Sequence, residues 1–116
     1  MIHGTIFLDI DGTIIKHQKD LLSMINNNAE VIEGTVEKLL EWHTAGYKII
    51  LTTARPESAR FKTQQQLSEL GIIYHQLIMN LGSGPRVVIN DTKPNGTITA
   101  IAKPLIRDTG IKDITL

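Results

Sequence analysis

Short runs of apolar residues alternate along the chain with stretches whose apolar residues have a helical period. Residues 4–10 (GTIFLDI) and 47–53 (YKIILTT) are rich in β-branched residues and predict two buried strands. Residues 74–79 (YHQLIM) and 86–90 (RVVIN) predict a third and a fourth strand. The pattern of the tail is ambiguous, and a short fifth strand near residues 97–102 is one interpretation.

Two segments between these runs have the spacing of amphipathic helices. The first covers residues 35–45 and ends at Gly46, and its expected inward face is Val36, Leu39, Leu40 and His43. The second opens at Pro56 and runs to about Leu70, with Ala59, Thr63, Leu67 and Leu70 inward. Residues 12–33 have weak periodicity and predict a long loop, or flap.

The order of these elements predicts an α/β fold with a Rossmann-like parallel sheet flanked by helices. The chain of 116 residues suits a single domain over residues 1–116. In parallel sheets of this kind, ligands bind at the carboxyl ends of the strands. Polar residues follow three of the predicted strands: Asp9 and Asp11, then Thr53 and Arg55, then Asn90 and Asp91.

Composition narrows the range of functions. Twelve basic and twelve acidic residues cancel, and only five residues are aromatic, so the chain lacks the basic excess and the stacking side chains of a nucleic-acid binder. There is no cysteine, and no apolar run approaches the roughly 18 residues of a membrane span. We therefore expect a cytoplasmic protein that acts on small molecules and binds neither nucleic acid nor membranes.

The carboxyl ends of the predicted strands form one edge of the sheet, which we call the rim. Its first motif, residues 9–13, combines two carboxylates with a sharp turn. Asp9 and Asp11 are two positions apart, so on a strand both side chains point to the same side. A divalent cation relieves the repulsion between them, and Mg2+ favours one or two carboxylates together with substrate phosphate. Asp91 adds a third carboxylate. A polar strand end followed by a turn is the plainer alternative, whereas a calcium loop fails because its twelfth position is Asp20.

Three segments in this order, residues 9–13 (DIDGT), 50–55 (ILTTAR) and 88–91 (VIND), resemble the haloacid dehalogenase superfamily of phosphohydrolases. The resemblance covers residues 4–92 and implies phosphoryl transfer to an aspartate. It implies that Asp9 is the nucleophile and that Asp11 protonates the leaving oxygen and then activates water. It also implies that Mg2+ is held by Asp9, the backbone carbonyl of Asp11 and Asp91, and that the Thr53 hydroxyl binds the phosphoryl group.

The chain departs from the family pattern at the cation that neutralises phosphate. The family has a lysine before the fourth strand, where this chain reads LGSGPR over residues 81–86. Lys62 is the preferred substitute, with Lys93 and Arg86 as alternatives. Arg55 is a second expected phosphate or substrate contact, and its alternative role is an ion pair with Glu57 or Asp91.

The predicted function is a Mg2+-dependent phosphatase for a small phosphomonoester. The intervals at 12–33 and 80–85 are too short for the cap domain of larger relatives, so the site is open to a large substrate or is covered by a neighbouring subunit in a homo-oligomer. Similarity to small capless relatives suggests a sugar phosphate. The alternatives are a non-catalytic module that binds a sugar phosphate or a partner, and a phospho-receiver domain, although residues 79–80 supply no acid where a receiver needs one.

Overall fold

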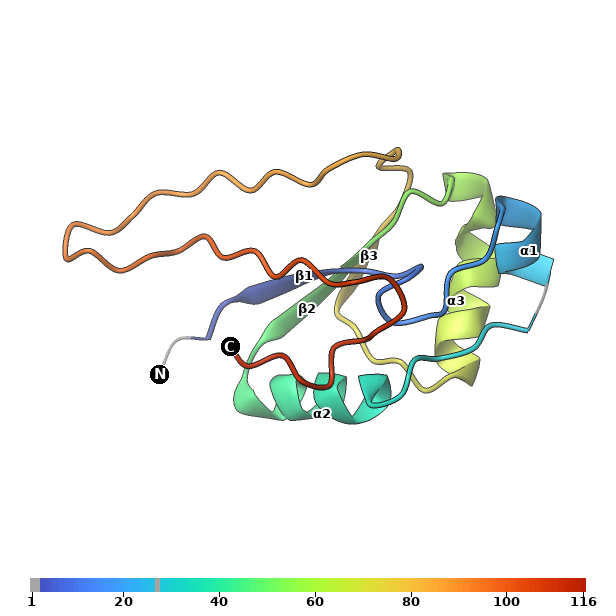
Figure 1. Cartoon of the computed structure of the whole chain (residues 1–116), viewed down its shortest axis with the longest axis horizontal. Helices are drawn as coiled ribbons and strands as arrows, with labels where there is room; N and C mark the ends of the chain where they lie inside the picture. Colours follow the sequence, from blue (N-terminus) through green and yellow to red (C-terminus); the bar gives the residue numbers. More distant parts are fainter. Residues whose placement is uncertain (1–2, 27) are drawn as a thin grey trace.

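Three parallel strands form the sheet in the computed structural model, which describes residues 3–26 and 28–116 (Figure 1). The strands are β1 (Thr5–Asp9), β2 (Lys48–Thr52) and β3 (Gln76–Ile78), in the order β1-β2-β3. Phe7 pairs with Ile50, and Ile50 pairs with Gln76. The first three predicted strands are therefore confirmed, each over a shorter range than the sequence indicated, and so is the α/β fold with a parallel sheet.

The connections between the strands are helical. Helix α2 (Thr35–Ala45) joins β1 to β2, and η1 (Glu57–Ala59) with α3 (Arg60–Glu69) joins β2 to β3. The bounds of α2 agree with the prediction, but its buried residues are Thr35, Leu39 and Trp42. The prediction was wrong for Leu40 and His43, which are exposed, because the stripe that packs on the sheet is rotated toward Trp42.

Both helical connections cover the same face of the sheet. Right-handed crossovers in a sheet of sequential strand order place every connecting helix on one side. That side holds the core, in which Leu8, Ile49, Leu51 and Leu77 pack with residues of α2 and α3. The opposite face carries Phe7, which is 60% exposed, and Ile78, which is 38% exposed. One face of this sheet is thus largely uncovered.

The flap contains a short helix that the sequence did not predict, α1 (Leu21–Asn26). The first residues of the flap, which precede α1, belong to the core, since Ile14 and Ile15 are buried and Ile15 forms isolated bridges with Asp11 and Val31. The rest of the described flap has no further regular element. Within residues 3–26 and 28–116, no helix has the length and apolar character needed to span a membrane.

The predicted fourth strand is wrong. Residues 82–106 instead form an extended excursion, which we call the arm, and it lies along the 49 Å long axis of the molecule (Figure 1). Parallel strands need a connection of about a dozen residues or more. Only residues 79–85 separate β3 from the predicted strand, so 86–90 cannot join this sheet as a parallel strand. No strand forms at 97–102 either.

Candidate functional site

The carboxyl ends of β1 and β2 bring four of the predicted site residues to one rim. Asp9 is the last residue of β1 and pairs with Thr52 at the end of β2. Asp11 follows Asp9 in a tight loop, and Thr53 and Arg55 follow β2. The Thr53 hydroxyl oxygen accepts a hydrogen bond from the backbone N–H of Arg55 at 3.1 Å, which fixes the turn after the strand.

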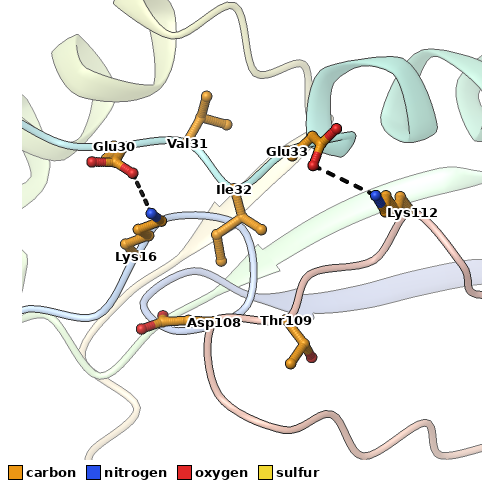
Figure 2. Close-up of a pocket in the computed structure, with 8 residues that line it drawn as sticks. All are labelled: Lys16, Glu30, Val31, Ile32, Glu33, Asp108, Thr109 and Lys112. Carbon is orange, nitrogen blue, oxygen red and sulfur yellow. Dashed lines mark hydrogen bonds and ion pairs between the residues drawn. The ribbon is translucent and has the colours of Figure 1, made fainter.

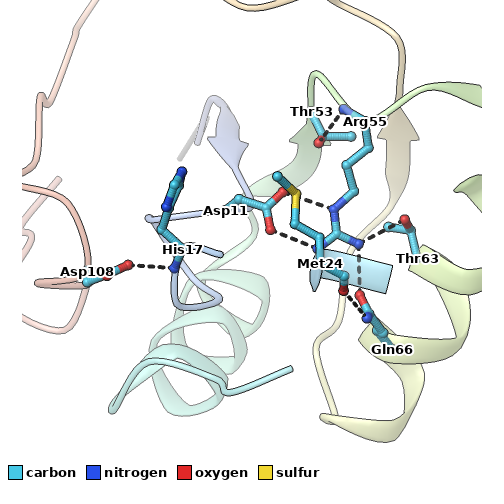
Figure 3. Close-up of polar contacts among 8 residues, drawn as sticks. All are labelled: Asp11, His17, Met24, Thr53, Arg55, Thr63, Gln66 and Asp108. Carbon is cyan, nitrogen blue, oxygen red and sulfur yellow. Dashed lines mark hydrogen bonds and ion pairs between the residues drawn. The ribbon is translucent and has the colours of Figure 1, made fainter. Parts of the chain in front are cut away.

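A buried ion pair joins the two sides of this rim (Figure 3). The Arg55 side chain donates from Nε to Asp11 Oδ2 at 2.9 Å and from Nη2 to Asp11 Oδ1 at 2.7 Å. Arg55 Nη1 also donates to Thr63 Oγ1 at 3.0 Å and to Gln66 Oε1 at 2.8 Å, both on α3. The Arg55 side chain is 2% exposed and that of Asp11 13%, so this pair is held within the fold.

This arrangement gives Arg55 a role that the sequence did not identify. The expected alternative partners, Glu57 and Asp91, are both wrong, because Arg55 binds Asp11 and Glu57 pairs with Arg60. Four donor contacts leave the guanidinium little capacity for a ligand. Arg55 therefore orients Asp11, and a direct contact between Arg55 and phosphate stays a prediction.

Asp9 has a different environment from Asp11. Its side chain reaches the surface, and among the described residues it forms no ion pair. Partial withdrawal from bulk water raises the pKa of Asp9, and the negative charge of Asp11 raises it further. The backbone N–H of Ile10 and the charges of Arg86 and Arg55 act in the opposite direction. Asp9 is thus the carboxylate of the pair that a ligand can approach.

The three candidate phosphate cations lie in different places. Arg86 is close enough for its charge to lower the pKa of Asp9, and its guanidinium donates to the carbonyls of Gly82 and Gly84 at 3.1 and 3.0 Å. Lys62 lines a cavity between α1 and α3, and Lys93 lies in the turn of the arm. Among the three, Arg86 is the one whose charge acts on Asp9, and the role of Lys62, Lys93 or Arg86 in neutralising phosphate stays a prediction.

The structure does not bring Asp91 to the two aspartates of the rim. Asp91 is an exposed residue of the arm, whose outgoing limb runs away from the rim (Figure 1). Within the described chain, no group of three histidine or acidic side chains lies close enough to hold a metal ion. Both oxygens of Asp11 are held by Arg55, so Asp9 is the carboxylate at this rim that is free to bind a cation. The metal role of Asp91 stays a prediction.

The C-terminal segment contributes contacts that the sequence did not reveal. Gly12 has φ of +89°, and a Cβ there would lie 3.3 Å from Arg107 Cγ. The backbone N–H of Asp108 donates to the Gly12 carbonyl at 2.8 Å, and Asp108 Oδ1 accepts from the backbone N–H of His17 at 2.9 Å. No sequence signal indicated this packing, because residues 107 and 108 follow a segment without clear periodicity.

A cavity of about 360 Å3 lies between the flap and the C-terminal segment (Figure 2). Its charged side chains include two ion pairs, Lys16 with Glu30 and Lys112 with Glu33. None of the predicted site residues lines it. Because its charges largely cancel and the rim residues lie elsewhere, this cavity is separate from the candidate site.

Comparison with solved structures supports the fold. A crystal structure of a protein from Vibrio cholerae covers 98% of this chain and 91% of its own, with 15% identity and a TM-score of 0.59. D,D-heptose 1,7-bisphosphate phosphatase from B. bronchiseptica, crystallised with magnesium and phosphate, covers 70% of this chain and 51% of its own, at 14% identity and a TM-score of 0.51. These identities establish similarity of fold alone.

A third structure, the Pnkp1/Rnl/Hen1 complex, matches 72% of this chain at 23% identity and a TM-score of 0.59. This chain spans only 30% of that protein. No sequence among the curated proteins matches. A family model described as "PITM 1-3, LNS2 domain" matches residues 6–112, which is most of the chain. The chain therefore belongs to the LNS2 domain family, and the haloacid dehalogenase resemblance is confirmed at the level of a small phosphohydrolase fold.

Proposed function

We propose that the protein is a Mg2+-dependent phosphatase that hydrolyses a small phosphomonoester through an aspartyl-phosphate. The observation that carries the proposal is the division of roles within the aspartate pair. Asp9 reaches solvent without an ion-pair partner among the described residues, whereas Arg55 holds both oxygens of Asp11. One carboxylate is available to attack phosphorus and the other is fixed beside it.

The proposed reaction has two steps. An Asp9 oxygen forms a bond to phosphorus while the bond between phosphorus and the ester oxygen breaks, and Asp11 gives a proton to that oxygen. Water then attacks the phosphorus of the aspartyl-phosphate while the bond between phosphorus and the Asp9 oxygen breaks, Asp11 accepts a proton from the water, and inorganic phosphate leaves. The two hydrogen bonds from Arg55 fix the position of Asp11 beside Asp9, and at least one of them must open before an Asp11 oxygen can carry the proton that it gives.

Positive charge and a hydroxyl group support binding of the phosphoryl group. Lys62 stays a candidate cation, and Arg86 is a second one because its charge acts on Asp9. The Thr53 hydroxyl oxygen accepts from the Arg55 backbone, which leaves its hydrogen for donation, but Thr53 is buried, so the loop after β2 must open before phosphate can reach it. Mg2+ would supply further neutralisation, but within residues 3–26 and 28–116 no three acidic or histidine side chains gather to hold it, and neither step above is routed through the ion.

The test is hydrolysis of p-nitrophenyl phosphate with and without Mg2+, using the wild type and Asp9→Asn. We expect Mg2+-dependent turnover that Asp9→Asn reduces by at least about a thousandfold, because the nucleophile is lost. Asp113→Asn, which alters an exposed carboxylate outside the rim, should leave the rate unchanged. Equal rates for Asp9→Asn and the wild type would contradict the assignment of the nucleophile.

A second candidate function is a phosphate-binding module without turnover. The lack of a cluster of three acidic or histidine side chains among the described residues favours it. A panel of sugar phosphates, with a phosphorylated oligonucleotide included because one similar structure is an RNA repair complex, separates the two functions. Turnover of a small phosphomonoester supports the phosphatase, and binding of the same compounds without turnover by the wild type supports the module. The zero net charge predicts no activity on the oligonucleotide.

A further inference from the structure

The arm presents strand-like backbone and apolar side chains to solvent. Among the described residues, none forms a backbone–backbone hydrogen bond with residues 82–92. The outgoing limb carries Val87, Val88 and Ile89, which are 78%, 57% and 92% exposed. Extended chain with unpaired amides and three successive apolar residues is the kind of segment that adds to the edge of another sheet.

The sheet has a matching unpaired edge. In the part of the chain that the structure describes, β1 pairs with β2 on one side only, and its other edge is open. Phe7 projects from β1 on the uncovered face of the sheet and is 60% exposed. Large apolar side chains at an open sheet edge indicate a surface that another strand covers.

Within one chain, the arm cannot pair in parallel with the open edge of β1. Residue 81 is held at the rim, where its backbone N–H donates to the Thr53 carbonyl at 3.2 Å. Five residues from there to Arg86 span at most about 17 Å. A path down the height of β1 and across the sheet to its outer edge needs about 20 Å, from a rise of about 3.3 Å per residue and a strand spacing of about 4.8 Å. Figure 1 accordingly shows the outgoing limb running antiparallel to β1.

We infer that residues 86–91 of one copy of this chain pair in parallel with the open edge of β1 in a second copy, and that Asp91 thereby completes the partner's Asp9–Asp11 site. A limb that runs antiparallel to its own β1 is parallel to β1 of a copy turned end for end. A two-fold axis relates two such copies, so each arm occupies the edge of the other chain.

The side-chain pattern supports one register for this pairing. If Asp91 lies opposite Asp9, then Ile89 lies opposite Phe7, and Val87 lies opposite Thr5, because paired residues in parallel strands share a face. The two most exposed apolar residues of the outgoing limb then extend the uncovered face beside Phe7. The same register places Asn90, a polar residue, next to Asp91 at the partner's rim.

The exchange would also bring a third carboxylate to each rim. One chain provides two carboxylates at the rim, and its third candidate lies on the arm. Pairing in trans gives each site two carboxylates from one chain and one from the other, all oxygen donors suited to Mg2+. This second part of the inference rests on the proposed function, whereas the pairing of the arm does not.

The absence of cysteine allows a direct test of the pairing. Phe7→Cys and Ile89→Cys are introduced in separate, differently tagged full-length chains, which are co-expressed and oxidised. We expect a covalent heterodimer on non-reducing gels. Leu40→Cys, at a residue that is 55% exposed on α2, replaces Phe7→Cys in the control and should give none. No covalent heterodimer with Phe7→Cys, or a monomeric wild type in sedimentation, would overturn the inference.

The contribution of Asp91 is tested by complementation between two impaired chains. Differently tagged Asp9→Asn and Asp91→Asn chains are co-expressed, the heterodimer is isolated through both tags, and Mn2+ binding is titrated. Pairing in trans gives one intact site per heterodimer, so we expect about half of the wild-type stoichiometry. Neither parent homodimer has an intact site. A heterodimer that binds no more Mn2+ than the parents would overturn the metal role of Asp91.

The two experiments separate failure of the pairing from failure of the proposed function. A cross-linked dimer and half-stoichiometric Mn2+ binding, with no phosphatase activity in the wild type, would leave the pairing supported and the phosphatase contradicted. Phosphatase activity in a chain that forms no dimer would support the phosphatase and contradict the pairing.

Discussion

Loss of Arg55 should destabilise the fold more than loss of any exposed arginine, and the size of the effect follows from its contacts. Replacing Arg55 with Met keeps a long apolar side chain but removes both bonds to Asp11 and those to Thr63 and Gln66. Removing one member of a buried pair costs about 3–5 kcal/mol, and the partial exposure of Asp11 favours the lower end. Unsatisfied acceptors on α3 add about 1 kcal/mol.

We therefore expect Arg55→Met to lower the free energy of unfolding by about 4 kcal/mol. With a denaturant slope of about 2 kcal/mol per molar, the urea midpoint falls by about 2 M. Urea titrations followed by circular dichroism measure this shift. Adding Asp11→Asn to Arg55→Met should recover part of the loss, because it removes the carboxylate left without its partner.

The chain offers a matched control. Arg60 also makes a bidentate contact with a carboxylate, from Nε to Glu57 Oε2 at 2.8 Å and from Nη2 to Glu57 Oε1 at 3.0 Å. This pair lies at the surface and within one helical turn. Exposed pairs of this kind contribute little. Arg60 also donates to the Leu77 carbonyl at 3.3 Å, so Arg60→Met should lower the midpoint slightly, and by much less than Arg55→Met. Equal shifts for Arg55→Met and Arg60→Met would refute the view that the Arg55–Asp11 pair holds the rim together.

Three further predictions concern stability and the flap. Because its pKa is raised above the ordinary value of 3.8, Asp9 binds its proton more tightly in the folded state, so its stabilising contribution is present below pH 3.8 and is lost as the pH rises. Asp9→Asn should therefore raise the urea midpoint at pH 7 in EDTA and change it little at pH 3.8 or below; a lower midpoint at pH 7 would contradict this. Gly110 has φ of +86°, and the Cβ of Gly110→Ala would lie 2.6 Å from a buried isoleucine, so this change should lower the free energy of unfolding by about 3 kcal/mol in denaturant titrations. Gly82 has φ of +73° and open space around it, so Gly82→Ala should lower it by about 1 kcal/mol. Gln66→Leu removes the link between Arg55 and the carbonyl of Met24 in α1, so amides of α1 should exchange with deuterium faster than in the exposed control Gln65→Leu; equal exchange would contradict this docking role.

The elements that the sequence predicted correctly are those in which local pattern and packing agree. β1 and β2 are short apolar runs that lie in the core, and Gly46 ends α2 with a positive φ as expected. The resemblance to phosphohydrolases likewise depended on residues at the ends of these strands, and the structure brings Asp9, Asp11, Thr53 and Arg55 to one rim.

The errors arose where local pattern does not determine the partner. Val87, Val88 and Ile89 are strand-like, but whether they join the sheet depends on the length of the connection from β3, which a local pattern does not encode. The partner of Arg55 was missed for a related reason. Asp11, Thr63 and Gln66 are distant in sequence and meet the guanidinium only after α3 packs beside the rim.

The most direct test of the central claim is to identify the residue that carries phosphate during turnover. The wild type is mixed with p-nitrophenyl phosphate and Mg2+, quenched in acid, and analysed by intact and peptide mass spectrometry. We predict the added mass of one phosphoryl group on the peptide that contains Asp9, its loss on treatment with hydroxylamine, and its absence in Asp9→Asn. Phosphate on any other residue, or undiminished labelling of Asp9→Asn, would contradict Asp9 as the nucleophile.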